Sequence, residues 1–191
     1  MTEIRVDRTI DCKGLSCPMP IVRTKKAIDE MEAGQVLEVV ATDPGSVADV
    51  KGWAHRTGHQ FLGTLTEGKV FRHFIRKSRP EETKPEQRYP HTVTNEELEE
   101  RQADGGVLLD VREPAEYAFS HIPGAILVPL GELEQRLQAL TPYQNQPVYV
   151  ICRTGSRSDL ACQVLAEHGF KQVYNVLPGM IHWQGPTVQS L

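Results

Sequence analysis

The apolar residues of this 191-residue chain recur at strand and helix spacings in turn, which predicts an α/β protein. In the first part, apolar and polar residues alternate in the strand segments, and the helical segments place apolar residues on one face. Ser46 with Asp49 predicts a helix start that is capped by a side chain. The order is strand, helix, strand, helix and two strands, over 4–11, 21–31, 36–42, 46–57, 60–66 and 69–76. This β-α-β-α-β-β order predicts a two-layer sandwich of helices on one sheet.

Strands and helices also alternate in the last hundred residues. Thr94 and Glu97 form a capping-box pattern at the first helix. The expected elements that follow are strands over 106–111, 125–128, 148–152 and 173–176 and helices over 114–119, 132–140 and 158–168. The last of these helices is expected to face inward with Leu160, Ala161, Val164 and Leu165. This alternation predicts a mainly parallel sheet covered by helices on both faces.

A charged, proline-rich stretch separates the two parts. Residues 78–90 have neither a helical nor a strand period, which is typical of a flexible linker. We therefore predict a first domain over 1–77, a linker over 78–90 and a second domain over 91–191. At full stretch, 13 residues span about 43 Å, which is enough to bring two surface cysteines together.

The segment Cys152-Arg153-Thr154-Gly155-Ser156-Arg157 carries the clearest chemistry. It follows a buried strand and precedes a helix, so the backbone N–H groups of the loop are expected to point into the concavity at the helix start. Their partial positive charge, together with Arg153 and Arg157, should favour a thiolate at Cys152. Ligands of parallel sheets bind beyond the carboxyl ends of the strands, where Cys152 falls. A thiolate in such a cationic loop is a nucleophile.

The loop is short. Four residues lie between Cys152 and Arg157, whereas phosphate-ester enzymes with a cysteine loop place five there, so this loop should hold a smaller group such as a single sulfur. The segment resembles the active-site loop of the single-domain rhodanese family, Cys-Arg-x-Gly-x-Arg. Further matching pieces are Leu109-Asp110-Val111-Arg112-Glu113-Pro114-x-Glu116-Tyr117, His121-Ile122-Pro123-Gly124-Ala125 and Gly179-Met180-x-x-Trp183.

The rhodanese resemblance implies that Cys152 forms a persulfide and passes its outer sulfur to an acceptor. Arg153, Thr154, Gly155, Ser156 and Arg157 would bind the donor, and the pair Asp110 and Arg112 would order the loop. An ion pair that only stabilises the fold is an equally open interpretation of Asp110 and Arg112.

A second cysteine with chemical character is Cys17, beside two prolines. Pro18 and Pro20 are tolerated only in the first turn of a helix, so Cys17 falls at or just before a helix start, a position expected to stabilise a thiolate. The motif Gly14-Leu15-x-Cys17-Pro18-x-Pro20 resembles the TusA (SirA-like) family of sulfur carriers, and the resemblance covers about 4 to 77, including Asp43-Pro44-Gly45-Ser46, Trp53 and Gly58-His59. It implies that Cys17 accepts sulfur as a persulfide and hands it on.

Together, the two resemblances predict a fusion that acts as a sulfurtransferase. Cys152 would take sulfur from thiosulfate or a glutathione persulfide and relay it to Cys17, which would deliver it to a protein or thiol acceptor without a cofactor. A redox or reactive-sulfur sensor without turnover is the alternative from another class. A small phosphatase or arsenate reductase is a third interpretation, and the short loop argues against it.

Composition argues against several other classes of protein. The net charge of −4 argues against nucleic-acid binding, and no apolar run approaches the roughly 18 residues of a membrane span. The N-terminus lacks the apolar core of a signal peptide, which predicts a cytoplasmic protein with reduced cysteines.

The remaining candidate ligands and thiols carry weaker signals. Cys12 is interpreted as a packing residue, with a resolving thiol as the alternative, and Cys162 as a packing residue. His55 and His59 have helical spacing but no third ligand nearby, so no metal site is predicted.

Overall fold

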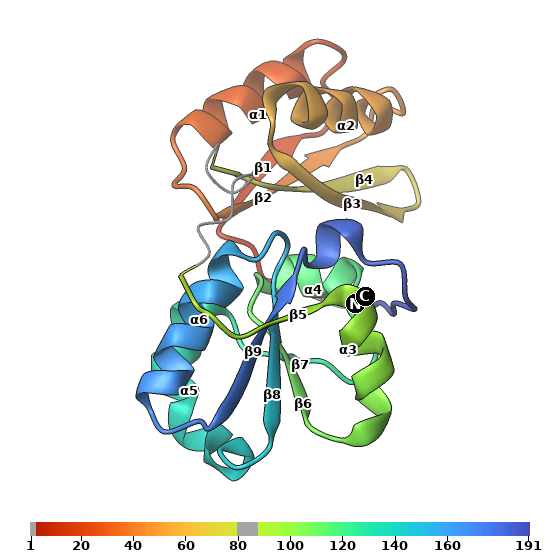
Figure 1. Cartoon of the computed structure of the whole chain (residues 1–191). Coiled ribbons are helices and arrows are strands. Elements are labelled where there is room, and N and C mark those ends of the chain that lie inside the picture. Colours follow the sequence, from red (N-terminus) through yellow and green to blue (C-terminus); the bar gives the residue numbers. More distant parts are fainter. Residues whose placement is uncertain (1–2, 80–87) are drawn as a thin grey trace. The chain divides into compact units, whose positions relative to one another are not determined.

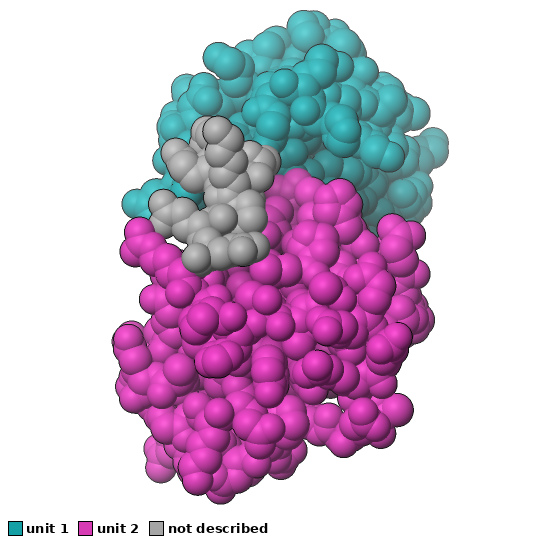
Figure 2. All heavy atoms as spheres, in the orientation of Figure 1, with its two compact units in different colours: residues 1–80, 191 teal, residues 81–190 magenta. Residues whose placement is uncertain are grey.

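The structure is a computed structural model that describes residues 3–79 and 88–191. The chain forms two compact units, residues 1–80 with residue 191 and residues 81–190, which we call the first and the second unit (Figure 2). The predicted linker, 78–90, lies mostly outside the described residues. None of the helices in the described ranges is long and apolar enough to cross a membrane.

The first unit is a four-stranded sheet with both of its helices on one face (Figure 1). Its strands lie in the order β1-β2-β4-β3, with β1 parallel to β2 and the other pairs antiparallel. The core between sheet and helices contains Ile28, Leu37, Val39 and Trp53. The elements are β1 (Arg8–Cys12), α1 (Met19–Asp29), β2 (Val36–Ala41), α2 (Ser46–Thr57), β3 (Gln60–Glu67) and β4 (Val70–Arg76). The β-α-β-α-β-β sandwich is therefore confirmed.

Two local predictions in the first unit were wrong. The first strand begins at Arg8 rather than Ile4, because the Oδ2 atom of Asp7 accepts the N–H of Val36 at 2.7 Å and a side chain takes the place of a ladder bond there. Ser46 does not cap α2 through its side chain. Its hydroxyl lies 2.9 Å from Nε2 of the buried His73 and so holds the helix start to β4 instead.

The second unit contains a five-stranded parallel sheet in the order β5-β9-β8-β6-β7. Its strands are β5 (Thr92–Thr94), β6 (Val107–Asp110), β7 (Ile126–Leu127), β8 (Pro147–Ile151) and β9 (Gln172–Leu177). Its α-helices are α3 (Asn95–Arg101), α4 (Pro114–Phe119), α5 (Leu133–Leu140) and α6 (Ser156–Glu167). Short 3-10 helices are η2 (Gln102–Asp104), η3 (Leu130–Glu132), η4 (Thr141–Tyr143) and η5 (Met180–His182).

Alternate residues of the strands feed two cores, one on each face of this sheet. On one face, Leu109, Val148 and Val150 pack with residues of α5 and α6. On the other face, Leu108 and Tyr149 pack with residues of α3 and α4 (Figure 1). The predicted parallel sheet with helices on both faces is confirmed.

The predicted capping box of α3 is present, since Thr94 and Glu97 each accept a hydrogen bond from the backbone of the other. The inward face predicted for α6 was wrong at Leu160, whose side chain is 52% exposed. Its place is taken by Ser158 and Asp159, which are buried and polar. A pattern of apolar residues cannot reveal a helix face that buries polar groups for their hydrogen bonds.

The end of the predicted linker belongs to the hydrogen-bonding network of the second unit. Asp159 accepts the backbone N–H groups of Arg88 and Tyr89 through Oδ2, at 3.0 and 2.9 Å. The phenol of Tyr89 donates to the carbonyl of Val173 at 2.9 Å, and its ring lies in the core on the α6 side of the sheet. The exact domain boundaries at 77/78 and 90/91 remain a prediction.

The buried His73 generates a prediction about pH and stability. Burial lowers its pKa from 6.5 to about 4, and Thr64 and Ser46 lie within hydrogen-bond distance of its two ring nitrogens. Between these pH values the unfolded chain binds a proton that the folded one does not. The contribution of neutral His73 is therefore present above pH 6.5 and is lost as the pH falls towards 4.

Urea unfolding of the full chain in a Trp183→Phe background measures this loss, because Trp53 then reports on the first unit. We expect the free energy of unfolding to fall less steeply below pH 6.5 in His73→Asn than in the exposed control His55→Gln. Equal pH slopes in the two variants would contradict the assignment.

Candidate functional site

The loop of residues 152–157, which we call the Cys152 loop, joins β8 to α6 at the carboxyl edge of the parallel sheet. The N–H of Gly155 points back at the Sγ atom of Cys152, at 3.1 Å. Gly155 is the N-cap of α6 and has φ +96°, a left-handed conformation that favours glycine. Cys152 itself has no exposed surface, so the expectation of two surface cysteines was wrong for Cys152. The loop therefore encloses one sulfur atom and directs a backbone donor at it.

A second turn holds the carbonyl groups of this loop on its outer side. Met180 and Ile181 donate their N–H groups to the carbonyls of Cys152 and Arg153, at 2.9 and 3.0 Å. Gly179 has φ +95° and lies so close that a Cβ atom there would fall 2.7 Å from the carbonyl oxygen of Cys152. Because those carbonyls point to the N–H groups of the second turn, their negative ends do not face the sulfur and do not oppose negative charge on it.

Arg157 is committed to a buried carboxylate. It donates to both oxygens of Glu116 on α4, at 2.7 and 2.9 Å. Glu116 is only 2% exposed, and its Oε2 also accepts the N–H of Glu113. This bidentate pair ties the end of the loop to α4. Glu116 was not predicted as a site residue, although it lies in one of the motifs that carry the rhodanese resemblance.

Asp110 and Arg112 form a second buried pair beside the loop. Asp110 ends β6 and stands opposite Ile151, the residue before Cys152. Its carboxylate accepts the Nε and Nη2 atoms of Arg112, and Arg112 Nη2 also donates to the carbonyl of Ser120 at 2.8 Å. Asp110 therefore lies next to the start of the Cys152 loop, which is compatible with both interpretations of the pair.

The other predicted loop residues differ in exposure. Arg153 and Ser156 are half-buried, while Thr154 is buried with its hydroxyl 3.5 Å from that of Ser156. Sequence reasoning missed Ser158 and Asn175, which are both fully buried and reach the loop through their side chains. A polar residue inside an apolar strand, Asn175 in β9, is the one signal that could have found them.

Cys17 is exposed and directly precedes the N-cap residue of α1, Pro18. The helix start offers it few donors. Pro20 has no N–H, Met19 donates to the carbonyl of Ser16 at 3.0 Å, and Val22 donates to that of Pro18 at 3.1 Å. The prolines place Cys17 at a helix start as predicted. They carry no N–H, however, and the N–H groups of Met19 and Val22 already donate to backbone carbonyls, so none of these residues offers a donor to a thiolate.

The expectation that this position favours a thiolate was wrong. Partial desolvation, hydrogen bonding to Asp49 and the negative charges of Asp49 and Asp43 raise the pKa of Cys17. Both carboxylates belong to the α2 end of the first unit, far from Cys17 in the sequence. Desolvation, the largest of these causes, and the two carboxylates all disfavour the charged form of the Cys17 thiol.

The other two cysteines are packing residues by their burial. Cys12 and Cys162 have no exposed surface and lie in the cores of the first and second units. Burial raises the pKa of both thiols. All four cysteines are free.

The side chains of His55 and His59, which have helical spacing, do not form a common metal site. His59 packs against Trp53 at 5.6 Å and accepts the N–H of Ser78, while His55 is exposed. Across residues 3–79 and 88–191, no group of three or more His, Cys, Asp or Glu side chains could hold a metal ion.

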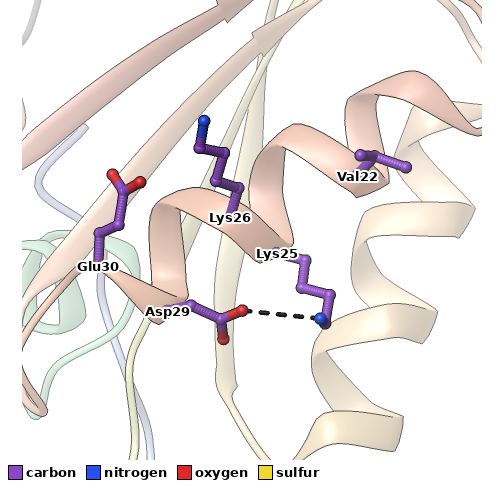
Figure 3. Close-up of a pocket in the computed structure, with 5 residues that line it drawn as sticks. All are labelled: Val22, Lys25, Lys26, Asp29 and Glu30. Atoms are coloured by element: carbon purple, nitrogen blue, oxygen red, sulfur yellow. Dashed lines mark ion pairs between the residues drawn. The ribbon is translucent and has the colours of Figure 1, made fainter.

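A shallow hollow lies on the outer face of α1 (Figure 3). Its lining residues are Val22, Lys25, Lys26, Asp29 and Glu30. Lys25 and Asp29 form an ion pair across it, with 3.7 Å between Nζ and Oδ2. Neither Cys17 nor Cys152 lines it, so we assign it no part in sulfur chemistry.

Comparison with known proteins decides the family. The family model "Sulfurtransferase TusA" matches residues 8–77, and "Rhodanese-like domain" matches residues 94–186. The chain is 45% identical over 179 residues to a protein of Bacillus subtilis (strain 168) named "Putative sulfur carrier protein YrkF", covering 93% of this chain and 96% of that protein. The chain belongs to the family in which a TusA domain is fused to a rhodanese domain.

Solved structures resemble each domain separately. A rhodanese-related protein from Thermoplasma volcanium is 29% identical, covers 52% of this chain and 98% of its own, and has a TM-score of 0.48. A SirA-like protein from Desulfitobacterium hafniense is 32% identical, covers 38% of this chain and 99% of its own, and has a TM-score of 0.35. Cys17 lies within the matched TusA domain, and Cys152 within the matched rhodanese domain.

The carboxylate beside Cys17 generates a prediction for the TusA domain. We expect Asp49→Asn to increase the rate at which iodoacetamide alkylates Cys17 at pH 7, because removal of a negative neighbour lowers the pKa of the thiol. The increase should stay below about tenfold, since interactions of exposed charges are screened by solvent. The control is Asp29→Asn, which removes an exposed carboxylate from α1, the helix that follows Cys17. Equal rates in both variants would disprove this role of Asp49.

The buried pair in the rhodanese domain generates a prediction about stability. Glu116→Gln leaves Arg157 without its buried carboxylate, which typically costs about 3 kcal/mol. The control Glu132→Gln removes a partly exposed partner of Arg136 and should cost less than about 1 kcal/mol. Urea unfolding of the full chain, followed through Trp183 in a Trp53→Phe background, measures both. A cost for Glu116→Gln no larger than that of the control would contradict this account.

Proposed function

We propose that the protein is a rhodanese-type sulfurtransferase that loads sulfur on Cys152 and relays it to Cys17. The observation that carries the proposal is the enclosure of the Cys152 sulfur, with the Gly155 N–H directed at it from 3.1 Å. A loop that holds one sulfur atom suits a persulfide better than a phosphate ester. Membership of a family that joins a TusA and a rhodanese domain supports the same conclusion.

In the first step, the Cys152 thiolate attacks the outer sulfur of thiosulfate. The S–S bond of thiosulfate breaks, and sulfite leaves with the bonding electron pair. With a glutathione persulfide as donor, glutathione thiolate leaves instead. The half-buried Arg153 and the Gly155 N–H stabilise the anionic donor and the persulfide, and Thr154, Ser156 and Arg157 shape the loop around them.

In the second step, the Cys17 thiolate attacks the outer sulfur of the Cys152 persulfide. A new S–S bond forms on Cys17 and the Cys152 thiolate is released, so no oxidant or reductant is consumed. Cys17 is exposed, as a carrier must be to present its sulfur to a downstream protein or thiol acceptor. The two cysteines that react belong either to one chain or to two copies of it.

The proposed chemistry requires a compartment in which cysteine thiols stay reduced. Persulfide transfer needs free thiols, and all four cysteines are unpaired in the structure. The proposal therefore places the protein in the cytoplasm, where thiols stay reduced. No cofactor enters either step.

Substitution of each cysteine separates the two steps. We expect Cys152→Ser to abolish sulfite release from thiosulfate in the presence of a thiol acceptor, by more than about a hundredfold, because the nucleophile is lost. In mass spectra of the treated wild type, Cys17 should gain about 32 Da, the mass of one sulfur, and this adduct should be absent from Cys152→Ser.

Two further variants serve as controls. Cys17→Ser should still form the adduct on Cys152. Cys162→Ala should behave as the wild type if it is folded, because burial raises the pKa of the Cys162 thiol and keeps it protonated. Unchanged sulfite release by Cys152→Ser would reject the enzyme assignment. An undiminished adduct on Cys17 in that variant would reject the relay alone.

A further inference from the structure

The side chain of Asn175 connects β9 to the Cys152 loop. Its Nδ2 group donates to the carbonyl of Gly155 at 3.2 Å, and its Oδ1 accepts the hydroxyl of Ser158 at 2.6 Å. The opposite amide orientation would set Oδ1 against the carbonyl oxygen of Gly155, so the orientation follows from the contacts. Asn175 is fully buried, which keeps water from replacing either bond.

This orientation determines what Ser158 offers to the sulfur. A serine hydroxyl has one proton, and that of Ser158 is given to Asn175. The Oγ atom also lies 3.2 Å from Sγ of Cys152, towards which it can present only a lone pair. The Cys152 thiol is then the donor in this contact, so the arrangement in the structure suits a protonated sulfur.

Loss of the Cys152 proton to solvent reverses this preference. A lone pair of Ser158 would then face a negatively charged sulfur, which is unfavourable. Rotation about the Cβ–Oγ bond of Ser158 turns its proton from Asn175 to the sulfur, with no movement of heavy atoms. The thiolate would receive two donors, the Gly155 N–H and the Ser158 hydroxyl.

We propose that Ser158 is a catalytic hydrogen-bond donor for the Cys152 thiolate, and that Asn175 is a positioning residue that holds its proton while Cys152 is a thiol. The proposal rests on the proposed function of Cys152 as the sulfur acceptor. It adds two residues to that site, neither of which belongs to the six-residue loop. The same hydroxyl is in reach of the inner sulfur of a Cys152 persulfide.

Other ionisable groups lie on the elements packed around the Cys152 loop and must stay constant in a test. They lie on the loop, at the end of β6 and just after it, on α4, on α6 and on η5. They are Arg153, Asp110, Arg112, Glu116, Arg157, Asp159, Cys162 and His182. None is changed in the variants below, so a difference between variants reports the hydroxyl and the amide.

The test measures the pH dependence of Cys152 alkylation by iodoacetamide in full-length Cys17→Ser protein, with mass spectrometry to locate the label. The pH of the half-maximal rate reports the thiol pKa and does not depend on how accessible the sulfur is. We expect Ser158→Ala to raise this midpoint by about one pH unit, a tenfold smaller thiolate fraction below it, because a hydrogen bond to a charged group is lost. Ser158→Thr, which keeps a hydroxyl, should stay closer to the wild-type midpoint than to that of Ser158→Ala.

Asn175→Ala should shift the pH midpoint of Cys152 alkylation in the opposite direction. Without the amide, the Ser158 proton is free to face the sulfur in both states, so the midpoint should fall below that of the wild type. In the double variant with Ser158→Ala, the midpoint should equal that of Ser158→Ala, since Asn175 acts through Ser158. If Asn175→Ala does not fold, the Ser158 variants alone decide.

A midpoint in Ser158→Ala at or below the wild-type value would overturn the proposal, as would equal midpoints in Ser158→Thr and Ser158→Ala. A rise in Asn175→Ala would overturn the part assigned to the amide. Alkylation involves no sulfur transfer, so these outcomes are independent of whether Cys152→Ser retains sulfite release. Failure of the proposed function and failure of this inference are therefore distinguishable.

Discussion

The site around Cys152 depends on the contact between the Gly155 N–H and the Cys152 sulfur. Here the backbone donor reaches back across three residues where the chain turns into the left-handed region at Gly155, the N-cap of α6. The carbonyls of Cys152 and Arg153 turn outward, where the two residues after Gly179 donate their N–H groups to them. Two glycines and two backbone hydrogen bonds thus define a space for one sulfur atom.

Buried polar groups surround that space, and each of them is paired. Glu116 pairs with Arg157 through two hydrogen bonds between side chains, and Asp110 pairs with Arg112 through three. Buried charges are costly unless they are paired and hydrogen-bonded, so removal of one partner strands the other. The end of the loop is consequently held from α4, by a residue distant in the sequence.

The two cysteines differ in exposure and in electrostatic surroundings, which fits their proposed roles as sulfur acceptor and sulfur carrier. Cys152 is enclosed and bonded, whereas Cys17 is exposed at the start of α1 with carboxylates nearby that raise its pKa. A thiol of higher pKa is a smaller fraction thiolate at neutral pH, yet its thiolate is the stronger nucleophile. An exposed thiol that is mostly protonated also reacts less with unintended oxidants and electrophiles.

Much of this could be predicted from the sequence, because it depends on spacing along the chain. The strand and helix periods gave both sheets, and the residues around Cys17 and Cys152 placed each cysteine at a helix start. Contacts between distant segments could not be predicted in this way. The pairing of Arg157 with Glu116, the amide of Asn175 near the loop and the acidic surroundings of Cys17 arise only when separate elements pack together. Periodicity reports which face of a helix is apolar, so it misassigned Leu160 in α6, where the buried face carries Ser158 and Asp159 for their hydrogen bonds.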